Sequence, residues 1–366
     1  MKVFVQIPCL NEEATLGTVI DSIPREIPGV SEVEILVIND GSTDRTVEVA
    51  KAHGVKHFVH HAGNQGLARS FRDGTDYALA HGADIVVNTD GDNQYPQSEI
   101  IRLVEPLVRG EADIAIGDRQ TATIKEFSWF KRKMQAFGSA VVNRAAGTKL
   151  PDAASGFRAY SRLALYRLNV ITQFSYCMET IIQAGNKQLR IASIPITTNP
   201  KTRESRLFKN IWQHMFKSGW AIIRSYLMFK PHVPLGLTAI LTGIIGLIPF
   251  IRFLVFYLMG YGAGHIQSLI FGSAMLVASI ISVTILIVAD LQKTNRTLIE
   301  DNLERTKELL YGPPAPQQRH EPAPQKRIEP APQQGSEPAP QQRSEPALTD
   351  TAPATPPAHG VADTGE

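Results

Sequence analysis

Short apolar runs alternate with amphipathic stretches over the first 200 residues of this 366-residue chain. The runs predict strands at Val3–Ile7, Glu34–Ile38, His57–His60, Asp84–Asn88 and Asp113–Ile116. Helical periodicity lies between them, at Glu12–Ser22, Asp44–His53, Leu67–His81 and Gln97–Arg109. Apolar strands separated by helices are typical of a parallel sheet covered on both faces. The pattern therefore predicts an α/β fold with a mostly parallel, Rossmann-like sheet, whose ligands bind beyond the carboxyl ends of the strands.

Two long uncharged runs follow, Val233–Ile251 and Ile266–Ala289. Each is long enough to cross a hydrocarbon core of about 30 Å. Residues 253–265 between them lack Lys and Arg, whereas basic residues flank the pair on its outer sides: Lys217, Arg224, Lys230, Lys293 and Arg296. By the positive-inside rule, this pattern predicts two transmembrane helices in a hairpin with both ends in the cytosol. A buried hairpin of a soluble protein is the alternative.

The segments around the hairpin have patterns of their own. In Ser205–Phe229, apolar and aromatic residues recur at helical spacing and alternate with basic ones, which predicts an amphipathic interfacial helix or, alternatively, a core helix. Pro249 is expected to kink the first span or mark its end, and Arg252 to extend toward the far interface. Gln292–Leu310 is expected to be a charged helix, and the Pro-rich octapeptide repeat from Glu321 predicts an extended, disordered tail.

Composition adds limits on partners and compartment. The 37 Lys and Arg residues nearly balance the 35 Asp and Glu residues, and the net charge of +2 implies no general attraction for nucleic acid. The two cysteines, Cys9 and Cys177, do not indicate a disulfide framework, so a reducing compartment fits. Met1–Leu10 is too short for a secretory signal and is expected to be the first strand.

Polar groups follow four predicted strands, in the segments Pro8–Glu13, Asn39–Asp44, Asp90–Gln94 and Gly117–Arg119. Asp90 and Asp92 can converge on one hard divalent ion and leave coordination positions for a diphosphate. Asp40 can accept hydrogen bonds from a nucleobase or ribose, and Arg119 can pair with phosphate. Taken alone, the first two segments could be turns and helix N-caps, with Asn11 as one such cap.

Together these residues resemble family 2 glycosyltransferases of the GT-A fold, in the branch that includes dolichyl-phosphate mannose synthase and bacterial polyprenyl-phosphate glycosyltransferases. The resemblance covers about Lys2–Phe229, and the membrane hairpin fits the bacterial branch. It is carried by Pro8–Glu12, Asn39–Ser42, Asn64–Gly66, Asp90–Asp92 with Gln94, Gly117–Arg119 and Ser155–Tyr160. The chain departs from the family at Leu10, Asn39 and Arg203, where an aromatic residue, aspartate and glycine are usual.

The resemblance implies roles for the matching residues. The nucleoside pocket would be lined by Pro8, Glu12 and Asp40. The site for Mg²⁺ or Mn²⁺ and the donor diphosphate would be formed by Asp90, Gly91, Asp92 and Gln94. Arg119 would face a phosphate and Arg206 would close over it. Candidates for binding an acceptor phosphate are Lys131, Arg132, Lys133 and Arg158, and the catalytic roles fall to Asp92, Arg119 and Arg158.

The sequence patterns and the resemblance together predict five segments: a GT-A domain at 1–203, an interfacial helix at 204–230, a hairpin at 231–291, a charged helix at 292–312 and a tail at 313–366. The expected reaction is metal-dependent, inverting transfer of a sugar from a UDP- or GDP-sugar to a polyprenyl phosphate at the cytosolic membrane face. The interfacial helix and the hairpin could support a homo-oligomer. The alternatives are an enzyme that elongates a glycolipid or polysaccharide, and a non-catalytic scaffold that uses the repeat tail.

Overall fold

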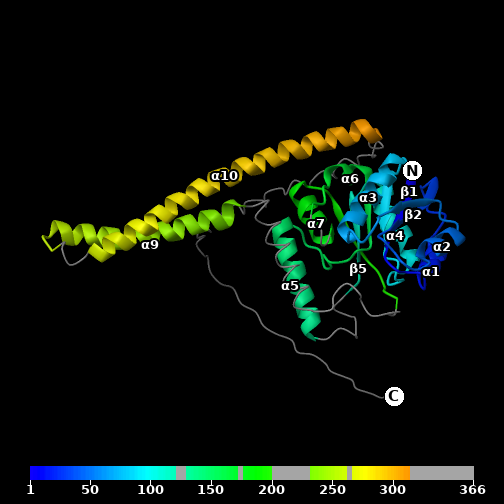
Figure 1. Cartoon of the computed structure of the whole chain (residues 1–366), viewed down its shortest axis with the longest axis horizontal. Coiled ribbons are helices and arrows are strands. Elements are labelled where there is room, and N and C mark those ends of the chain that lie inside the picture. Colours follow the sequence, from blue (N-terminus) through cyan, green and yellow to red (C-terminus); the bar gives the residue numbers. More distant parts are fainter. Residues whose placement is uncertain (121–128, 172–175, 200–230, 262–265, 314–366) are drawn as a thin grey trace, which may run out of the picture. The chain divides into compact units, whose positions relative to one another are not determined.

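The computed structural model describes residues 1–120, 129–171, 176–199, 231–261 and 266–313, without the side chains of 129–137 (Figure 1). Its sheet has seven strands in the order β3-β2-β1-β4-β6-β5-β7. They are β1 (Lys2–Cys9), β2 (Glu32–Asn39), β3 (His57–His60), β4 (Ile85–Asn88), β5 (Ile114–Asp118), β6 (Arg158–Ser161) and β7 (Ile191–Pro195). β6 is antiparallel to both of its neighbours, β4 and β5, and the other described pairings are parallel.

Helices cover both faces of this sheet. They are α1 (Leu16–Ser22), α2 (Thr46–Ala52), α3 (Leu67–Ala80), the 3-10 turn η1 (Gln97–Glu99), α4 (Ile100–Val108), α5 (Trp129–Ala146), α6 (Arg162–Arg167) and α7 (Tyr176–Asn186). Alternate side chains of β1 point to opposite faces. Val3 and Val5 pack in a core with α1 and α4. Phe4 packs in a second core with α3, α5 and α7. The predicted α/β fold with a mostly parallel sheet is confirmed.

Two strands and one helix start differ from the sequence-based expectation. β6 and β7 were not predicted, because neither contains a long apolar run. The four residues of β6 are held by strands on both sides, with Arg158 in register with Asn88 and with Ile116. α1 begins at Leu16 with Thr15 as its N-cap, so Asn11 is not a helix cap; Asn11 has a positive φ of 58° instead.

Two helices, α9 (His232–Leu258) and α10 (Ile266–Tyr311), are long and apolar enough to cross a membrane. They run side by side (Figure 1). Their apolar side chains point outward: Ile248 is 65 % exposed and Ile280 66 %, which is unlike a core helix of a soluble protein. The backbones approach at glycines, since a Cβ added at Gly246 would lie 2.9 Å from the carbonyl oxygen of Gly272. Such small-residue contacts are typical of packed membrane helices.

α10 runs unbroken for 46 residues, so the second predicted span and the predicted charged helix are parts of one helix. Pro249 lies inside α9, which continues to Leu258. The guanidinium of Arg252 lies 5.9 Å from the ring centre of Phe256. The expected interfacial helix and the repeat tail lie outside the described residues.

Candidate active site

The carboxyl ends of β1, β2 and β4 meet at one edge of the sheet, because these strands are parallel neighbours. β1 lies between β2 and β4, so the order of strands reverses at β1. Ligands of open α/β sheets bind beside such a reversal. Glu12 follows β1, Asp40 follows β2 and Asp90 follows β4, so the structure brings these three predicted carboxylates to one edge.

Asp90 and Asp92 lie in the turn after β4. Asp92 Oδ1 accepts a hydrogen bond from the backbone N–H of Gln94 (3.1 Å), and Asn93 between them has a φ of 58°. Burial, together with repulsion from Asp92 and Glu12, raises the pKa of Asp90 to about 7, and the charge of Arg119 opposes the rise. Like charges that crowd together in this way favour uptake of a proton or a cation.

The loops after β1 and β4 are tied to each other. Thr15 Oγ1 donates a hydrogen bond to the carbonyl oxygen of Gly91 (2.7 Å). A Cβ added at Gly91 would lie 3.3 Å from Cγ of Glu12 and 3.3 Å from Sγ of Cys9. The backbone N–H of Glu12 donates to Thr46 Oγ1 (2.8 Å), which fixes the same loop to α2. Glu12 is thereby held against the Asp90–Asp92 turn.

Asp40 is only 5 % exposed, and both of its carboxylate oxygens have partners in the protein. Oδ1 accepts hydrogen bonds from the backbone N–H of Gln65 (2.8 Å) and lies 2.7 Å from Nδ1 of His61, while Oδ2 accepts from the N–H of Gly66 (3.0 Å). The turn beside it needs Gly41, whose φ is 81° and whose added Cβ would lie 2.7 Å from the backbone of Gly63. In this structure Asp40, expected to line the nucleoside pocket, organises the loop at residues 63–66.

Arg119, at the end of β5, is held by a carboxylate that the sequence did not single out. Its Nε donates to Asp152 Oδ2 (2.6 Å) and its Nη2 to Asp152 Oδ1 (3.0 Å). The side chain of Asp152 is fully buried and that of Arg119 is 13 % exposed. Although burial alone would raise it, the pKa of Asp152 is lowered by the hydrogen bonds and charge of Arg119. The pair fixes a guanidinium that acts electrostatically on Asp90.

Arg158, the first residue of β6, is fully enclosed. Its Nε donates to the carbonyl of Ser155 (2.7 Å), its Nη2 to that of Ala153 (3.0 Å), and its Nη1 to the carbonyl of Cys177 (2.8 Å) and to Thr180 Oγ1 (2.9 Å). These contacts join the segment before β6 to α7. The structure thus places Arg158 beneath the edge of the sheet, without bringing it into the group formed by Asp90 and Arg119.

A hydrogen-bonded network supports the Asp90 turn from below. In adjacent strands, Gln6 Nε2 donates to Asn88 Oδ1 (3.0 Å). Asn88 Nδ2 donates to Tyr176 Oη (2.7 Å) and to the carbonyl of Gly156 (3.1 Å), to which Tyr176 Oη also donates (3.0 Å). A Cβ added at Gly156 would lie 3.5 Å from Asp90 Oδ2, so Gly156 leaves open the space facing that carboxylate.

Sequence reasoning did not assign roles to Asp152, Asn88 or Tyr176. Asn88 carried a signal, since it is a polar residue at the end of an apolar strand. Asp152 and Tyr176 lie outside any periodic pattern and carried none.

The remaining predicted residues are more peripheral or are not described. Pro8 is a half-buried residue of β1, in register with Ile38. The backbone carbonyl of Gln94 accepts a hydrogen bond from Asn199 (3.0 Å). Arg206 and the side chains of residues 131–133 lie outside the described part.

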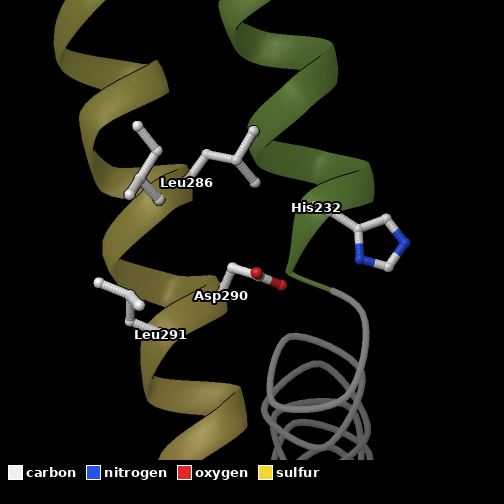
Figure 2. Close-up of a pocket in the computed structure, with 5 residues that line it drawn as sticks. His232, Leu286, Asp290 and Leu291 are labelled. Atoms are coloured by element: carbon white, nitrogen blue, oxygen red, sulfur yellow. The ribbon is translucent and has the colours of Figure 1, made fainter.

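At one end of the hairpin, a pocket between α9 and α10 is lined by His232, Leu286, Ile287, Asp290 and Leu291. Figure 2 shows the Asp290 carboxylate pointing toward the first turn of α9 and the His232 ring pointing away from α10. The uncharged stretch of α9 begins after His232, and that of α10 ends before Asp290. They therefore mark the end of the uncharged part of the hairpin, and no predicted site residue lines the pocket.

Known proteins resemble the chain over its α/β part. The sequence profile of glycosyl transferase family 2 matches residues 4–168. Polyprenol monophosphomannose synthase of Mycolicibacterium smegmatis is 28% identical over 235 residues, which are 60% of this chain and 87% of that protein. Undecaprenyl-phosphate mannosyltransferase of Micrococcus luteus is 29% identical over 211 residues, 54% and 83% of the two chains. A solved structure of glucosyl-3-phosphoglycerate synthase from Mycobacterium tuberculosis is 24% identical, with a TM-score of 0.48 over 62% of this chain and 78% of that one.

Residues 4–168 are a glycosyl transferase family 2 domain, and the chain is a glycosyltransferase. This domain contains most of β1, the strands β2 to β6 and the predicted site residues from Pro8 to Arg158.

Proposed function

We propose that this glycosyltransferase moves one sugar from a nucleotide-sugar to a polyprenyl phosphate in the membrane. The proposal rests on one observation: Glu12, Asp90 and Asp92 lie in the loops that follow β1 and β4, which contact each other at the strand reversal of a family 2 domain. Two apolar helices follow this domain. Mannose is the first candidate for the sugar, because two relatives are named for its transfer to a polyprenol or undecaprenyl phosphate.

The residues present fit a divalent cation. No three His, Cys, Asp or Glu side chains converge on one point among the described residues, so the protein alone would supply only part of the ligands. Asp90 and Asp92 would supply the protein ligands, and the diphosphate and water would supply the others, which suits Mg²⁺ or Mn²⁺. Burial and the neighbouring carboxylates Asp92 and Glu12 raise the pKa of Asp90 to about 7, and a bound cation would relieve this repulsion. Bound there, the cation would neutralise charge on the leaving diphosphate.

The residues of the chain have separate tasks in this proposal. Asp90 and Asp92 orient the donor diphosphate through the cation. Arg119, fixed by Asp152, directs positive charge to the same edge and stabilises phosphate oxygens. The acceptor oxygen of a lipid phosphate is already an anion near neutral pH, so the reaction needs no strong general base from the protein.

The membrane arrangement is part of the proposal. Both ends of the hairpin lie in the cytosol, with His232 and Asp290 at the inner boundary, so the catalytic domain works on the inner leaflet. Cysteine-accessibility labelling of intact cells tests this arrangement. Labelling at residue 301 by a membrane-impermeant reagent, before the cells are opened, would contradict it.

The reaction itself is tested in vesicles that contain the full chain and undecaprenyl phosphate. A panel of UDP- and GDP-sugars is added, and the lipid product is identified by mass. Asp92→Asn should lose transfer by a factor of about 10² or more while remaining folded, and excess chelator should do the same. Asp301→Asn is the matched control, because Asp301 is an exposed carboxylate on α10. No sugar on the lipid with any donor would exclude the proposed acceptor, and full activity of Asp92→Asn would exclude the site.

A further inference from the structure

The end of α6 carries a cationic cap from a distant part of the chain. The last carbonyl groups of a helix have no partners within that helix, and they form the negative end of its dipole. Lys307 of α10 lies against them. Its Nζ donates to the carbonyl oxygens of Leu165 (2.9 Å) and Leu168 (3.2 Å) and to Asn169 Oδ1 (3.2 Å). Burial lowers the pKa of Lys307, as expected for an ammonium group enclosed by the domain.

Ion pairs continue this contact along α10. Glu304 Oε1 accepts from Arg167 Nε (2.9 Å), and Glu300 Oε2 lies 2.7 Å from Lys187 Nζ. Arg296 Nε donates to the other oxygen of Glu300 (2.6 Å). The side chains of the pair formed by Lys187 and Glu300 are 19 % and 12 % exposed. Ion pairs that are shielded and linked in this way are stronger than isolated surface pairs.

The contact ends where α10 ends. Tyr166 of α6 donates its hydroxyl hydrogen to the carbonyl of Gly312 (2.7 Å), and its ring lies 6.5 Å from that of Tyr311. Tyr311 also packs against one of the two cores of the α/β domain. The docked segment therefore has an apolar anchor as well as charged ones.

The docking residues share one face of the helix. Glu300, Glu304, Lys307 and Tyr311 follow one another at steps of four, three and four residues, which places them in one stripe. Because α10 is continuous, this stripe belongs to the same helix as the second apolar span. From Asp290 to Lys307 the helix rises about 25 Å at 1.5 Å per residue.

We propose that the surface formed by the end of α6 and by Lys187, the residue after α7, is a docking surface for residues 296–312 of this chain. Docking makes α10 a strut that holds the catalytic domain in one orientation to the membrane hairpin. Lys307 is a positioning residue in this arrangement and does not touch the substrates. The consequence for activity rests on the proposed function: a docked domain should reach an acceptor embedded in a bilayer efficiently, whereas a soluble acceptor needs no such orientation.

The test compares Lys307→Met with Arg305→Met, which removes an exposed cation two residues away. Both full-length variants are placed in vesicles, and hydrogen exchange of residues 296–311 is followed by mass spectrometry. Lys307→Met should speed exchange there by about tenfold or more, and Arg305→Met by less than about twofold. The exchange experiment needs no activity, so it tests docking even if the proposed reaction is wrong.

Transfer is then measured with undecaprenyl phosphate in the vesicles and with a short, water-soluble prenyl phosphate. Lys307→Met should lose about tenfold in rate on the embedded acceptor and less than about twofold on the soluble one, since only the former depends on orientation. The double variant Arg167→Glu with Glu304→Arg swaps the two charges of this ion pair. It should restore the protection from hydrogen exchange that either single substitution removes. If Lys307→Met leaves hydrogen exchange of residues 296–311 unchanged, the proposed docking is wrong. If its transfer rate falls equally on both acceptors, the proposed role of α10 in orienting the domain is wrong.

Discussion

The buried pair Arg119–Asp152 gives the sharpest prediction about stability and site geometry. The side chain of Arg119 is only 13 % exposed in the wild-type structure. Asp152→Ala removes both carboxylate oxygens that accept its hydrogen bonds, while the rest of its surroundings stays in place. Removing one partner of a buried pair costs about 3–5 kcal/mol, because the remaining charge is left without compensation. Asp152→Asn keeps the shape and one acceptor oxygen, so it should cost less, about 1.5–3 kcal/mol.

These energies can be measured locally. Native-state hydrogen exchange of β4 and β5 in detergent should show a loss of protection of about 10²–10³-fold or more in Asp152→Ala, at 1.4 kcal/mol per factor of ten. The double variant Asp152→Ala with Arg119→Met should lose less than the sum of the two single variants, because it leaves no buried charge behind. Transfer should also fall in both variants of Asp152, since Arg119 is released from the site.

The control for this experiment is Glu111→Ala, which removes an exposed carboxylate near β5. It should change protection by less than about 0.5 kcal/mol. The reasoning would be refuted if Asp152→Ala lost no more protection than Glu111→Ala, or if the single-variant costs simply added in the double variant.

Three further predictions concern the hairpin, the support of the site and the effect of pH. Gly246→Leu should separate α9 from α10 and lower the thermal unfolding midpoint of the full chain in detergent by several degrees. Gly236→Leu, where the added side chain meets open space, should leave the midpoint unchanged. Equal midpoints for the two variants would contradict the close contact at Gly246. Tyr176→Phe should destabilise the domain by about 1–3 kcal/mol in urea unfolding, because it leaves the buried amide of Asn88 without one acceptor, and a cost near zero would contradict the network. The pKa of Asp152 is lower in the folded chain than in the unfolded one, so its stabilising effect is full above the unfolded pKa of about 3.9 and is lost as pH falls through the folded value. The stability gap between wild type and Asp152→Asn should therefore narrow below about pH 4 in acid titration of unfolding; a gap that widens there would refute the assignment.

The placement of the acidic residues at one edge of the sheet was largely predictable from the sequence. Apolar runs located β1 to β5, and the acidic residues that follow three of these strands placed Glu12, Asp40, Asp90 and Asp92 at one edge of the sheet. Parallel strands bring their carboxyl ends to one edge, so the strand pattern alone implied that these groups meet. The uncharged lengths of 233–251 and 266–289 likewise sufficed to predict the two apolar helices.

The roles of the basic residues depended on tertiary structure. Arg119 follows the last residue of β5 and Arg158 is the first residue of β6, and each was expected to contact a phosphate. In the folded chain, Arg119 pairs with Asp152, 33 residues away, and keeps an exposed edge. Arg158 is enclosed and donates four hydrogen bonds, to the segment before β6 and to α7. No local pattern separates these two outcomes.

Hydrophobic periodicity is a property of neighbouring residues, so the sequence alone predicted β1 to β5, α1 to α4, the two long apolar helices and the acidic residues that follow β1, β2 and β4. Which charge meets which partner depends on segments that become neighbours only when the chain folds. The burial of Arg158, the pairing of Arg119 with Asp152 and the contact of Lys307 with α6 across 142 residues were decided in that way. A buried charge must find its partner wherever the fold places one, and tertiary structure alone made those choices.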